Sequence, residues 1–330
     1  MSTSVEAYEV DLHMTWDLVA DIGGTNMRVS QVVDGQMVLR QDFPMTKDRN
    51  VSKTLRVVAD DLGATPRSIV AAGAGPVHDG QIRLTNGGWL VCERDIAQAT
   101  GAAQVRVIND FEAAAWSLAT LSDEDVKPIG DTGPLSPGHR AAVGPGTGLG
   151  VGCLIWDGVS YSVIPGEGGH VSIGPRTPDE VEVFTRMGAL WPQTQIGGTF
   201  SFEAEAMLSG TGLPYLYQAC GGASGLKGRE VFERARQGEA EAIRCRTIFA
   251  AHLASVAGDL AVTLKAHGGI FIVGGVAQAN QDVFDDVFWH HFKTGGRDKF
   301  TELRQSCGIY LVTIEDFGLR GCVNALAQMG

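Results

Sequence analysis

Two glycine-rich turns are the first places where this chain could do chemistry. Residues 20–26 (Ala-Asp-Ile-Gly-Gly-Thr-Asn) and residues 146–150 (Gly-Thr-Gly-Leu-Gly) each lie between short apolar runs of strand-forming residues. Glycine lets backbone N–H groups approach an anion because no Cβ intervenes and positive φ is permitted. Thr25 and Thr147 each add a hydroxyl donor. Two such turns in 330 residues predict a duplicated phosphate-binding unit, as in an ATP-using enzyme with two facing lobes.

A second candidate site is the polar pair Asn109 and Asp110. The pair follows residues 105–108, which are mostly apolar, and precedes an alanine-rich segment. Asp110 could simply cap the helix predicted there, because aspartate is a favoured N-cap. Alternatively, it could face a ligand, because ligands of α/β sheets bind at the carboxyl ends of the strands.

A third group contains acids and a histidine. Glu167 and His170 stand among three glycines, and a simple turn needs only one. A metal site is disfavoured, because no third ligand stands at a spacing typical of metal ligands. Hydrogen bonding to a polyol suits both side chains better, because both can accept hydrogen bonds from hydroxyl groups. On its own, Glu205 in a short helix is better explained by a solvated helix face than by a binding role. Asn86 precedes Gly87 in a turn that alone would mean little.

Other nucleotide-binding motifs are excluded. The chain has no Gly-x-x-x-x-Gly-Lys sequence, which excludes a P-loop NTPase. Residues 146–150 resemble the dinucleotide fingerprint, but the third spacing is wrong and strand residues follow where that motif needs a helix.

Composition limits the partners. The net charge of −12 disfavours nucleic acid and anionic membranes, and no run approaches the ~18–20 apolar residues of a membrane span. Residues 1–13 lack the basic and apolar regions of a signal peptide. We therefore expect a flexible N-terminal extension and a cytoplasmic protein.

The elements that must position these groups form a mixed α/β pattern that occurs twice, and the length favours two lobes. The first pattern predicts strands at 17–21, 27–33, 36–44, 68–73 and 105–109, and helices at 52–62, 93–100 and 110–121. The second follows a Gly-, Pro- and Ser-rich loop and predicts strands up to 164, at 269–273 and at 308–314, with helices across 177–266 (the longest at 240–266) and at 281–293 and 317–329.

These segments occur in the order found in bacterial glucokinases, and from Trp16 onward the chain resembles that ATP-dependent family. It does not resemble the zinc-containing repressor/open-reading-frame/kinase group of sugar kinases. The resemblance rests on residues 20–26, 108–111, 146–150, 165–170, 208–210 and 274–275.

The resemblance implies a duplicated actin-like ATPase (ribonuclease H-like) fold, with two lobes around a cleft. The smaller α/β lobe would be 14–111 plus about 315–330, and the larger α/β lobe 112–314. The implied reaction is transfer of the ATP γ-phosphoryl group to the 6-hydroxyl of D-glucose, with Mg²⁺, at the entry to glycolysis. We also expect a homodimer.

Carried over by position, the resemblance makes Asp110 the catalytic base and Asp21 the Mg²⁺ residue, acting through water. The implied sugar ligands are Asn86, Asn109, Asp110, Glu167, His170 and Glu205. The implied ATP-binding residues are Ala20, Asp21, Ile22, Gly23, Gly24, Thr25, Gly146, Thr147, Gly148, Gly274 and Gly275.

Two departures from the family leave fine hexose specificity open. Gly87 and Gly88 stand where the family often has bulkier polar residues, and Pro145 replaces a small residue. Mannose, fructose or glucosamine therefore remain alternative substrates. An actin-like assembly protein would lack Glu167, His170 and Glu205 as a set. A sugar-sensing regulator would need a DNA-binding module, for which the residues before Met14 are too few and too acidic.

Overall fold

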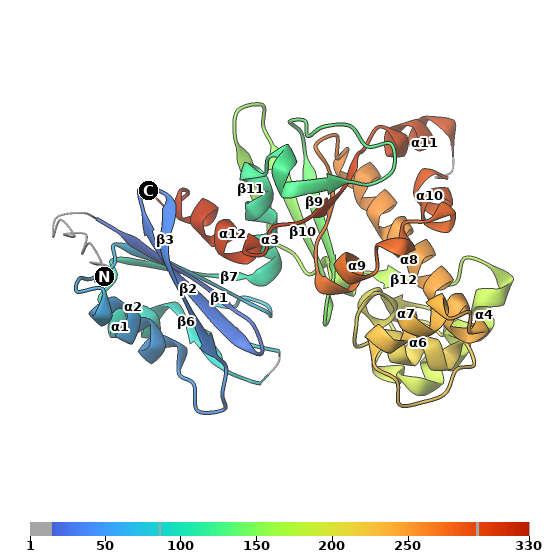
Figure 1. Cartoon of the computed structure of the whole chain (residues 1–330), viewed down its shortest axis with the longest axis horizontal. Coiled ribbons are helices and arrows are strands. Elements are labelled where there is room, and N and C mark those ends of the chain that lie inside the picture. The colour runs from blue at the N-terminus through green and yellow to red at the C-terminus, as the bar shows by residue number, and fades with distance from the viewer. Residues whose placement is uncertain (1–14, 86, 295–296, 330) are drawn as a thin grey trace, which may run out of the picture. The chain divides into compact units, whose positions relative to one another are not determined.

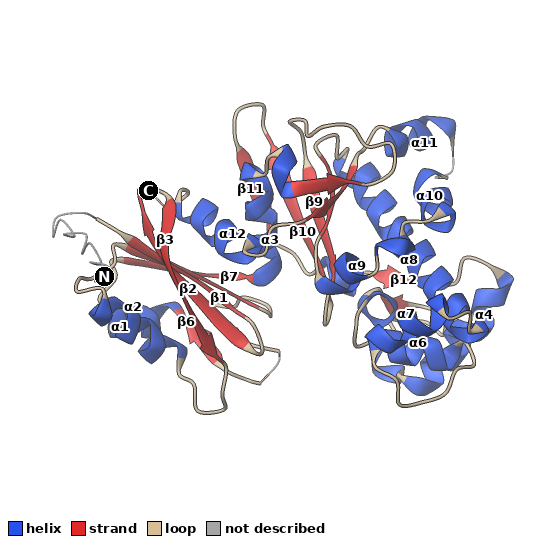
Figure 2. Ribbon diagram, viewed as in Figure 1, coloured by secondary structure: helices blue, strands red, loops and turns tan. Residues whose placement is uncertain are grey.

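The computed structural model describes residues 15–85, 87–294 and 297–329. They form two compact units: residues up to Ser117 together with those from Asp316 onward, and Leu118–Glu315. Figure 1 traces the chain through both units, and Figure 2 separates their sheets from their helices. The extension predicted for residues 1–13, and the sugar ligand predicted at Asn86, lie outside the described residues.

The first unit is built on a five-stranded sheet in the order β3-β2-β1-β4-β7. The hairpin strands β3, β2 and β1 are antiparallel, whereas β1, β4 and β7 run parallel. The strands are β1 (Asp17–Ile22), β2 (Asn26–Val33), β3 (Gln36–Pro44), β4 (Ser68–Gly73) and β7 (Gln104–Asn109), with a small hairpin of β5 (Gln81–Arg83) and β6 (Leu90–Cys92).

Helices complete the first unit: α1 (Val51–Asp61), α2 (Glu93–Thr100), α3 (Asp110–Ser117) and α12 (Phe317–Leu326). The central strands β1 and β4 are apolar and buried almost throughout, as expected for strands covered on both faces. The C-terminal helix α12 lies beside α3 (Figure 1). A Cβ at Gly321 would overlap the carbonyl oxygen of Ala113, so glycine permits this close packing.

The second unit repeats the topology of the first. Its sheet has the order β11-β10-β9-β14-β15-β8, and its first five strands show the same succession of two antiparallel and two parallel pairings. The predicted duplication of architecture is therefore confirmed. The strands are β8 (Val126–Pro128), β9 (Arg140–Pro145), β10 (Leu149–Trp156), β11 (Tyr161–Ile164), β14 (Gly269–Ile272) and β15 (Ile309–Val312), with a separate pair, β12 (Ser172–Ile173) and β13 (Phe202–Glu203).

The helices of the second unit pack around a core that includes Phe184, Phe202, Phe232 and Phe249. The longest, α8, would be long and apolar enough to cross a membrane, but 67% of its most apolar window is buried, as in the core helix of a globular protein. The helices are α4 (Pro178–Leu190), α5 (Glu205–Leu208), α6 (Leu213–Ala219), α7 (Gly228–Arg236), α8 (Ala240–Leu264), α9 (Gly275–Ala279), α10 (Asp286–Lys293) and α11 (Asp298–Gln305).

Two predicted helices are shorter in the structure than the sequence indicates. The helix predicted for 110–121 becomes a 3₁₀ turn, Leu118–Thr120, after α3 ends at Ser117. The helix predicted for 281–293 is interrupted: Gln281–Val283 is a 3₁₀ turn, and α10 begins anew. The side chain of Asp285 accepts hydrogen bonds from two N–H groups in the first turn of α10, so this N-cap sets where the helix begins.

Candidate active site

The two glycine-rich turns occupy equivalent places in the two sheets. The first joins β1 to β2, where the Gly23 N–H donates to the carbonyl of Asn26 at 2.9 Å. The second joins β9 to β10, where the Gly146 N–H donates to the carbonyl of Gly148 at 2.8 Å. Each turn therefore follows the first of the parallel strands, at the sheet edge where α/β proteins bind ligands.

In the first unit, this edge also carries the polar pair Asn109 and Asp110. The register aligns Ile22 with Gly73, and Gly73 with Asn109. The ends of β1, β4 and β7 are thus level, and the structure brings the first turn and Asp110 to the same edge. Gly24 and Thr25 are exposed there, whereas Ala20 and Ile22 are buried and can offer a ligand only backbone groups.

Asn109 is the residue that caps α3. Its Oδ1 accepts hydrogen bonds from the N–H groups of Phe111 (2.7 Å) and Glu112 (3.3 Å), and its Nδ2 donates to the carbonyl of Gly75 at 3.0 Å. These are the bonds of an N-cap. Asp110 is the first residue of α3 and half-buried, and its Oδ1 lies 3.1 Å from the backbone N of Phe111. The helix therefore has its cap without depending on the Asp110 carboxylate.

Asp21, the next-to-last residue of β1, lies among charged side chains. Its Oδ2 accepts from Nη1 of Arg28 at 3.0 Å, across the β1–β2 pairing. Close by, Arg40 binds both carboxylate oxygens of Asp316 at 2.6 Å. Burial raises the pKa of Asp21, and the charge and hydrogen bond of Arg28 oppose this only in part.

These features of Asp21 fit a magnesium site. A cation beside a buried carboxylate favours its charged form and so offsets the effect of burial. Mg²⁺ usually keeps several waters and is bound through one or two carboxylates together with substrate phosphates. Within the described ranges, no group of three or more His, Cys, Asp or Glu side chains is placed to hold a metal ion.

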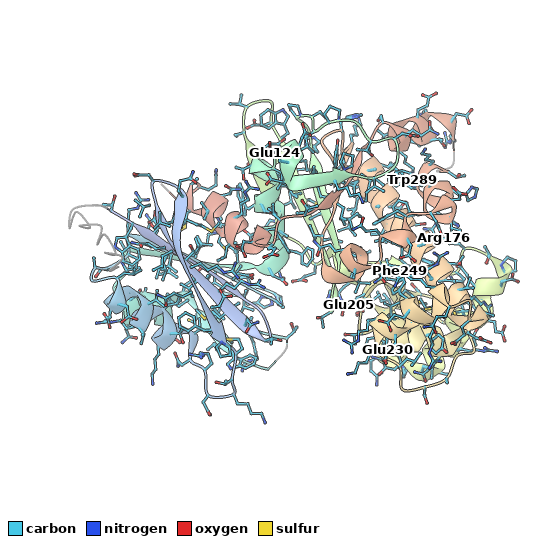
Figure 3. The ribbon with its side chains drawn as sticks, in the orientation of Figure 1. Glu124, Arg176, Glu205, Glu230, Phe249 and Trp289 are labelled. Atoms are coloured by element: carbon cyan, nitrogen blue, oxygen red, sulfur yellow. The ribbon has the colours of Figure 1, made fainter. Side chains whose placement is uncertain are left out.

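The second unit brings Glu167, His170 and Glu205 together. Glu167 precedes the 3₁₀ turn Gly168–His170, and Glu205 begins α5; Figure 3 labels Glu205. Burial lowers the pKa of His170, but the hydrogen bond to Glu203 and the charges of the surrounding glutamates raise it overall. The contributing charges include those of Glu205 and Glu167, so the predicted acids and histidine form one electrostatic cluster.

The glycines beside Glu167 have a packing reason. A Cβ at Gly169 would overlap the carbonyl oxygen of Leu149, and one at Gly168 would lie 2.7 Å from Cβ of Val151. Both positions therefore lie directly against strand β10. The loop that contains Glu167 and His170 is therefore packed closely against β10, the strand that follows the second turn.

Glu205 connects the acid and histidine cluster to the second glycine-rich turn. Its Oε2 accepts a hydrogen bond from the backbone N–H of Leu149 at 2.8 Å. A Cβ at Gly148 would overlap the same oxygen, so the carboxylate fills the space that a side chain would need. The acid and histidine cluster and the second glycine-rich turn are thus adjacent within one unit.

Further contacts draw two glycine segments to the same turn. The Gly210 N–H donates to the carbonyl of Gly146 at 2.8 Å, and the Thr211 hydroxyl donates to the carbonyl of Thr147 at 2.9 Å. Gly274 has φ of 89°, and a Cβ there would lie 2.7 Å from the carbonyl oxygen of Pro145. Backbone groups of Gly210 and Gly274 therefore lie close to the second turn.

A cavity of about 320 Å³ lies beside these segments in the second unit. Lys227 and Arg229 at the start of α7 supply positive charge, and Phe232 supplies an apolar surface. Sequence reasoning missed these residues, although a Lys-Gly-Arg run in an acidic chain was a usable signal. The cavity is lined by Gly210, Lys227, Arg229, Phe232, Gly275 and Asn280, among others.

The chain is similar to curated proteins over most of its length. A curated glucokinase of Rhizobium johnstonii is 37% identical over 308 residues, which cover 90% of this chain and 87% of that protein. A glucokinase of Rhizobium meliloti is 38% identical over 272 residues, covering 79% and 77%.

Solved structures show the same fold. The crystal structure of a glucokinase from an Antarctic psychrotroph superposes with a TM-score of 0.82 at 28% identity, covering 96% of this chain and all of that one. A repressor/open-reading-frame/kinase glucokinase of Streptomyces griseus, solved with glucose and AMPPNP, reaches 0.60 at 19% identity over 96% and 100%, which supports the fold alone. The family model described as glucokinase matches residues 18–329. With this match over most of its length and its duplicated actin-like ATPase fold, the chain belongs to the glucokinase family.

Proposed function

We propose that this protein transfers the γ-phosphoryl group of ATP to the 6-hydroxyl of D-glucose, giving glucose 6-phosphate and ADP. The observation that carries the proposal is Glu205, whose carboxylate belongs to the polyol-type cluster with Glu167 and His170 and also binds the backbone of the second glycine-rich turn. Membership of the glucokinase family supports the same reaction. We further propose that the two compact units serve as the smaller and larger lobes.

The proposed sugar ligands are Asn86, Asn109, Asp110, Glu167, His170 and Glu205. Carboxylates accept hydrogen bonds from sugar hydroxyls, and a sugar that lacks one hydroxyl leaves an acceptor unmatched, at a cost of about 1–3 kcal/mol. Asn109 already uses its carbonyl as the α3 cap and one amide hydrogen on Gly75. We therefore propose that it contributes its second amide hydrogen to the sugar.

Asp110 is the proposed general base. Phosphoryl transfer passes through a loose transition state in which the enzyme mainly positions groups and offsets charge. A carboxylate in the first turn of a helix is favoured in its charged form by the helix dipole. Such a weak base is suited to accept the hydroxyl proton late, as the new O–P bond forms.

The two turns and the cavity are the proposed ATP site. The Gly23 and Gly146 N–H groups are used within the turns, so the amides of Gly24, Thr25, Thr147 and Gly148 would hold phosphates. Gly274 and Gly275 would face the adenosine, for which the adjoining cavity offers space. Lys227 and Arg229 attract an anion that the net charge of −12 would otherwise repel. Asp21 would hold Mg²⁺ through water, and the ion would supply positive charge to the phosphates.

Removing either threonine hydroxyl from the turns is expected to weaken ATP use selectively. Thr25 and Thr147 are exposed, and valine keeps the β-branching of threonine, so Thr25→Val and Thr147→Val should fold normally. We expect a rise in KM for ATP of about threefold to tenfold, the value of one hydrogen bond. Thr185→Val, on the exposed face of α4, is the matched control. A change confined to KM for glucose would contradict the proposed role of the turns.

A coupled ADP-release assay over a sugar panel tests the proposed substrate. We expect kcat/KM for D-glucose to exceed the values for mannose, fructose and glucosamine. A higher value for any of these would replace glucose with that hexose while keeping the reaction. No sugar-dependent ADP release from any member would contradict the kinase assignment.

We also propose a cytoplasmic homodimer. ATP as phosphoryl donor favours the cytoplasm, and symmetric dimers are the commonest assemblies of soluble oligomers. One chain has a mass of 34.9 kDa. Light scattering during size-exclusion chromatography would contradict the dimer if it returned this mass at working concentrations.

A further inference from the structure

His170 has a partner that the sequence did not point to. The short strands β12 and β13 pair antiparallel, with Ser172 opposite Glu203. The Ala204 N–H also donates to the carbonyl of Val171 at 2.8 Å. These backbone bonds hold Glu203 beside the segment that immediately follows His170, so the two side chains meet on a fixed frame.

The contact between these side chains is a hydrogen bond with a defined direction. Oε2 of Glu203 lies 3.0 Å from Nδ1 of His170. A charged carboxylate can only accept, so Nδ1 carries the hydrogen. The partner of one ring nitrogen sets the state of the other, as it does for metal-binding histidines. Nε2 is therefore the nitrogen that remains for a ligand.

Carboxylates also surround the ring from the neighbouring elements. Glu203 on β13, Glu205 on α5 and Glu167 before the 3₁₀ turn all raise the pKa of His170, and together they outweigh the opposing effect of burial. The ring therefore stays cationic to higher pH than an ordinary histidine. A cationic ring donates from Nε2 to a hydroxyl oxygen, while Glu167 or Glu205 can accept that hydroxyl's hydrogen.

We propose that Glu203 is a positioning residue of the sugar site, which holds the His170 ring in the orientation and with the charge that bind a sugar hydroxyl. This inference rests on the proposed function, in which His170 contacts the sugar. The Glu203 side chain is 31% exposed and that of His170 is 47% exposed. An ion pair this exposed contributes little to stability, so its loss should affect binding rather than folding.

Glu203→Gln and Glu203→Ala separate charge from orientation. Glutamine keeps an oxygen that can accept from Nδ1 but removes the negative charge, whereas alanine removes both. Glu182→Gln is the matched control, because it removes an exposed carboxylate that pairs with Arg186 on α4. Glucose Kd without nucleotide, measured between about pH 5.5 and 9 to span histidine titration, and the NMR titration of His170 are the readouts.

The hydrogen bond that the cationic ring donates from Nε2 is complete below the pKa of His170 and is lost as pH rises through it, which weakens glucose binding. Because Glu203 raises that pKa, Glu203→Gln should shift both the NMR midpoint and the loss of glucose binding to lower pH, while binding at low pH stays near the parent value. Glu203→Ala should also weaken binding at low pH, by about tenfold. Glu182→Gln should match the parent.

A third variant, His170→Ala, separates this inference from the proposed function. If His170→Ala weakens glucose binding and both Glu203 variants match the parent at every pH, Glu203 is no positioning residue and the proposed sugar site stands. If Glu203→Gln weakens binding equally at all pH values and lowers the melting temperature, Glu203 has only a structural role. If His170→Ala leaves glucose Kd unchanged, the sugar site itself is wrong, and the inference falls with it.

Discussion

Replacing Asp110 with asparagine is expected to lower kcat by a factor of about 10² to 10⁴, while glucose Kd changes by no more than a few-fold. The amide cannot accept the proton of the 6-hydroxyl, but it keeps the size of the side chain. The fold should survive, because Asn109 supplies the oxygen that caps α3. Steady-state kinetics with direct measurement of glucose binding would separate the two effects.

A matched control for this variant exists in the same unit. Asp95 is an exposed acid in the first turn of α2, as Asp110 is an acid in the first turn of α3. Asp95→Asn should retain the parent kcat, because it changes a helix-terminal charge without touching the proposed site. Near-parental turnover by a folded Asp110→Asn variant would exclude Asp110 as the general base.

Local chemistry explains why much of the fold could be predicted from sequence. β3, β4 and α2 have the predicted ends, and a glycine marks the start of β3 and the ends of β4 and α2. Gly101, for example, ends α2 with φ of 78°, a conformation that suits glycine. The repeated order of strands could also be predicted, since each hairpin and each parallel strand has its own apolar pattern.

The site residues could be predicted only where they belong to a local sequence motif. The turns and Glu167 with His170 are dense in glycine and functional side chains, so they stand out in the sequence. Even so, the reason for Gly168 and Gly169 is contact with β10, which no local pattern shows. Asn109 was predicted as a ligand, and its additional role as the α3 cap became visible only from its hydrogen bonds.

Glu203 and the cavity lie beyond what such patterns reveal. β12 and β13 have two residues each, too few for a period-2 pattern, so the partner of His170 could not be predicted. The cavity joins the start of α7 to α9, elements about fifty residues apart in the chain, and its lining depends on tertiary packing. Helix α9 has five residues, too few for a periodic apolar face.

The link between the two proposed binding sites gives the second large expected effect. Gly148→Ala is expected to raise glucose Kd by about tenfold to a hundredfold. The new Cβ would overlap Oε2 of Glu205, so this oxygen must move. It can move without disturbing the backbone because it is at the end of a flexible side chain. The charge-assisted bond to the Leu149 N–H, which holds the carboxylate in place before the sugar binds, is then lost. Sugar binding must then order this side chain, and a cost equal to the contribution of such a bond, about 1.5–3 kcal/mol, corresponds to this change in Kd.

The same turn contains its own control for this variant. At Gly146, a new Cβ would meet only the carbonyl oxygen of Gly148, at an ordinary contact distance of 3.9 Å. Gly146→Ala should therefore leave glucose Kd unchanged when measured without nucleotide, although both alanines approach the proposed phosphate site. If both variants weaken glucose binding equally, the turn affects the sugar by a general distortion, and Glu205 is not the connection. If only Gly148→Ala weakens glucose binding, and its melting temperature stays near that of the parent, the second glycine-rich turn positions the carboxylate of Glu205 for the sugar.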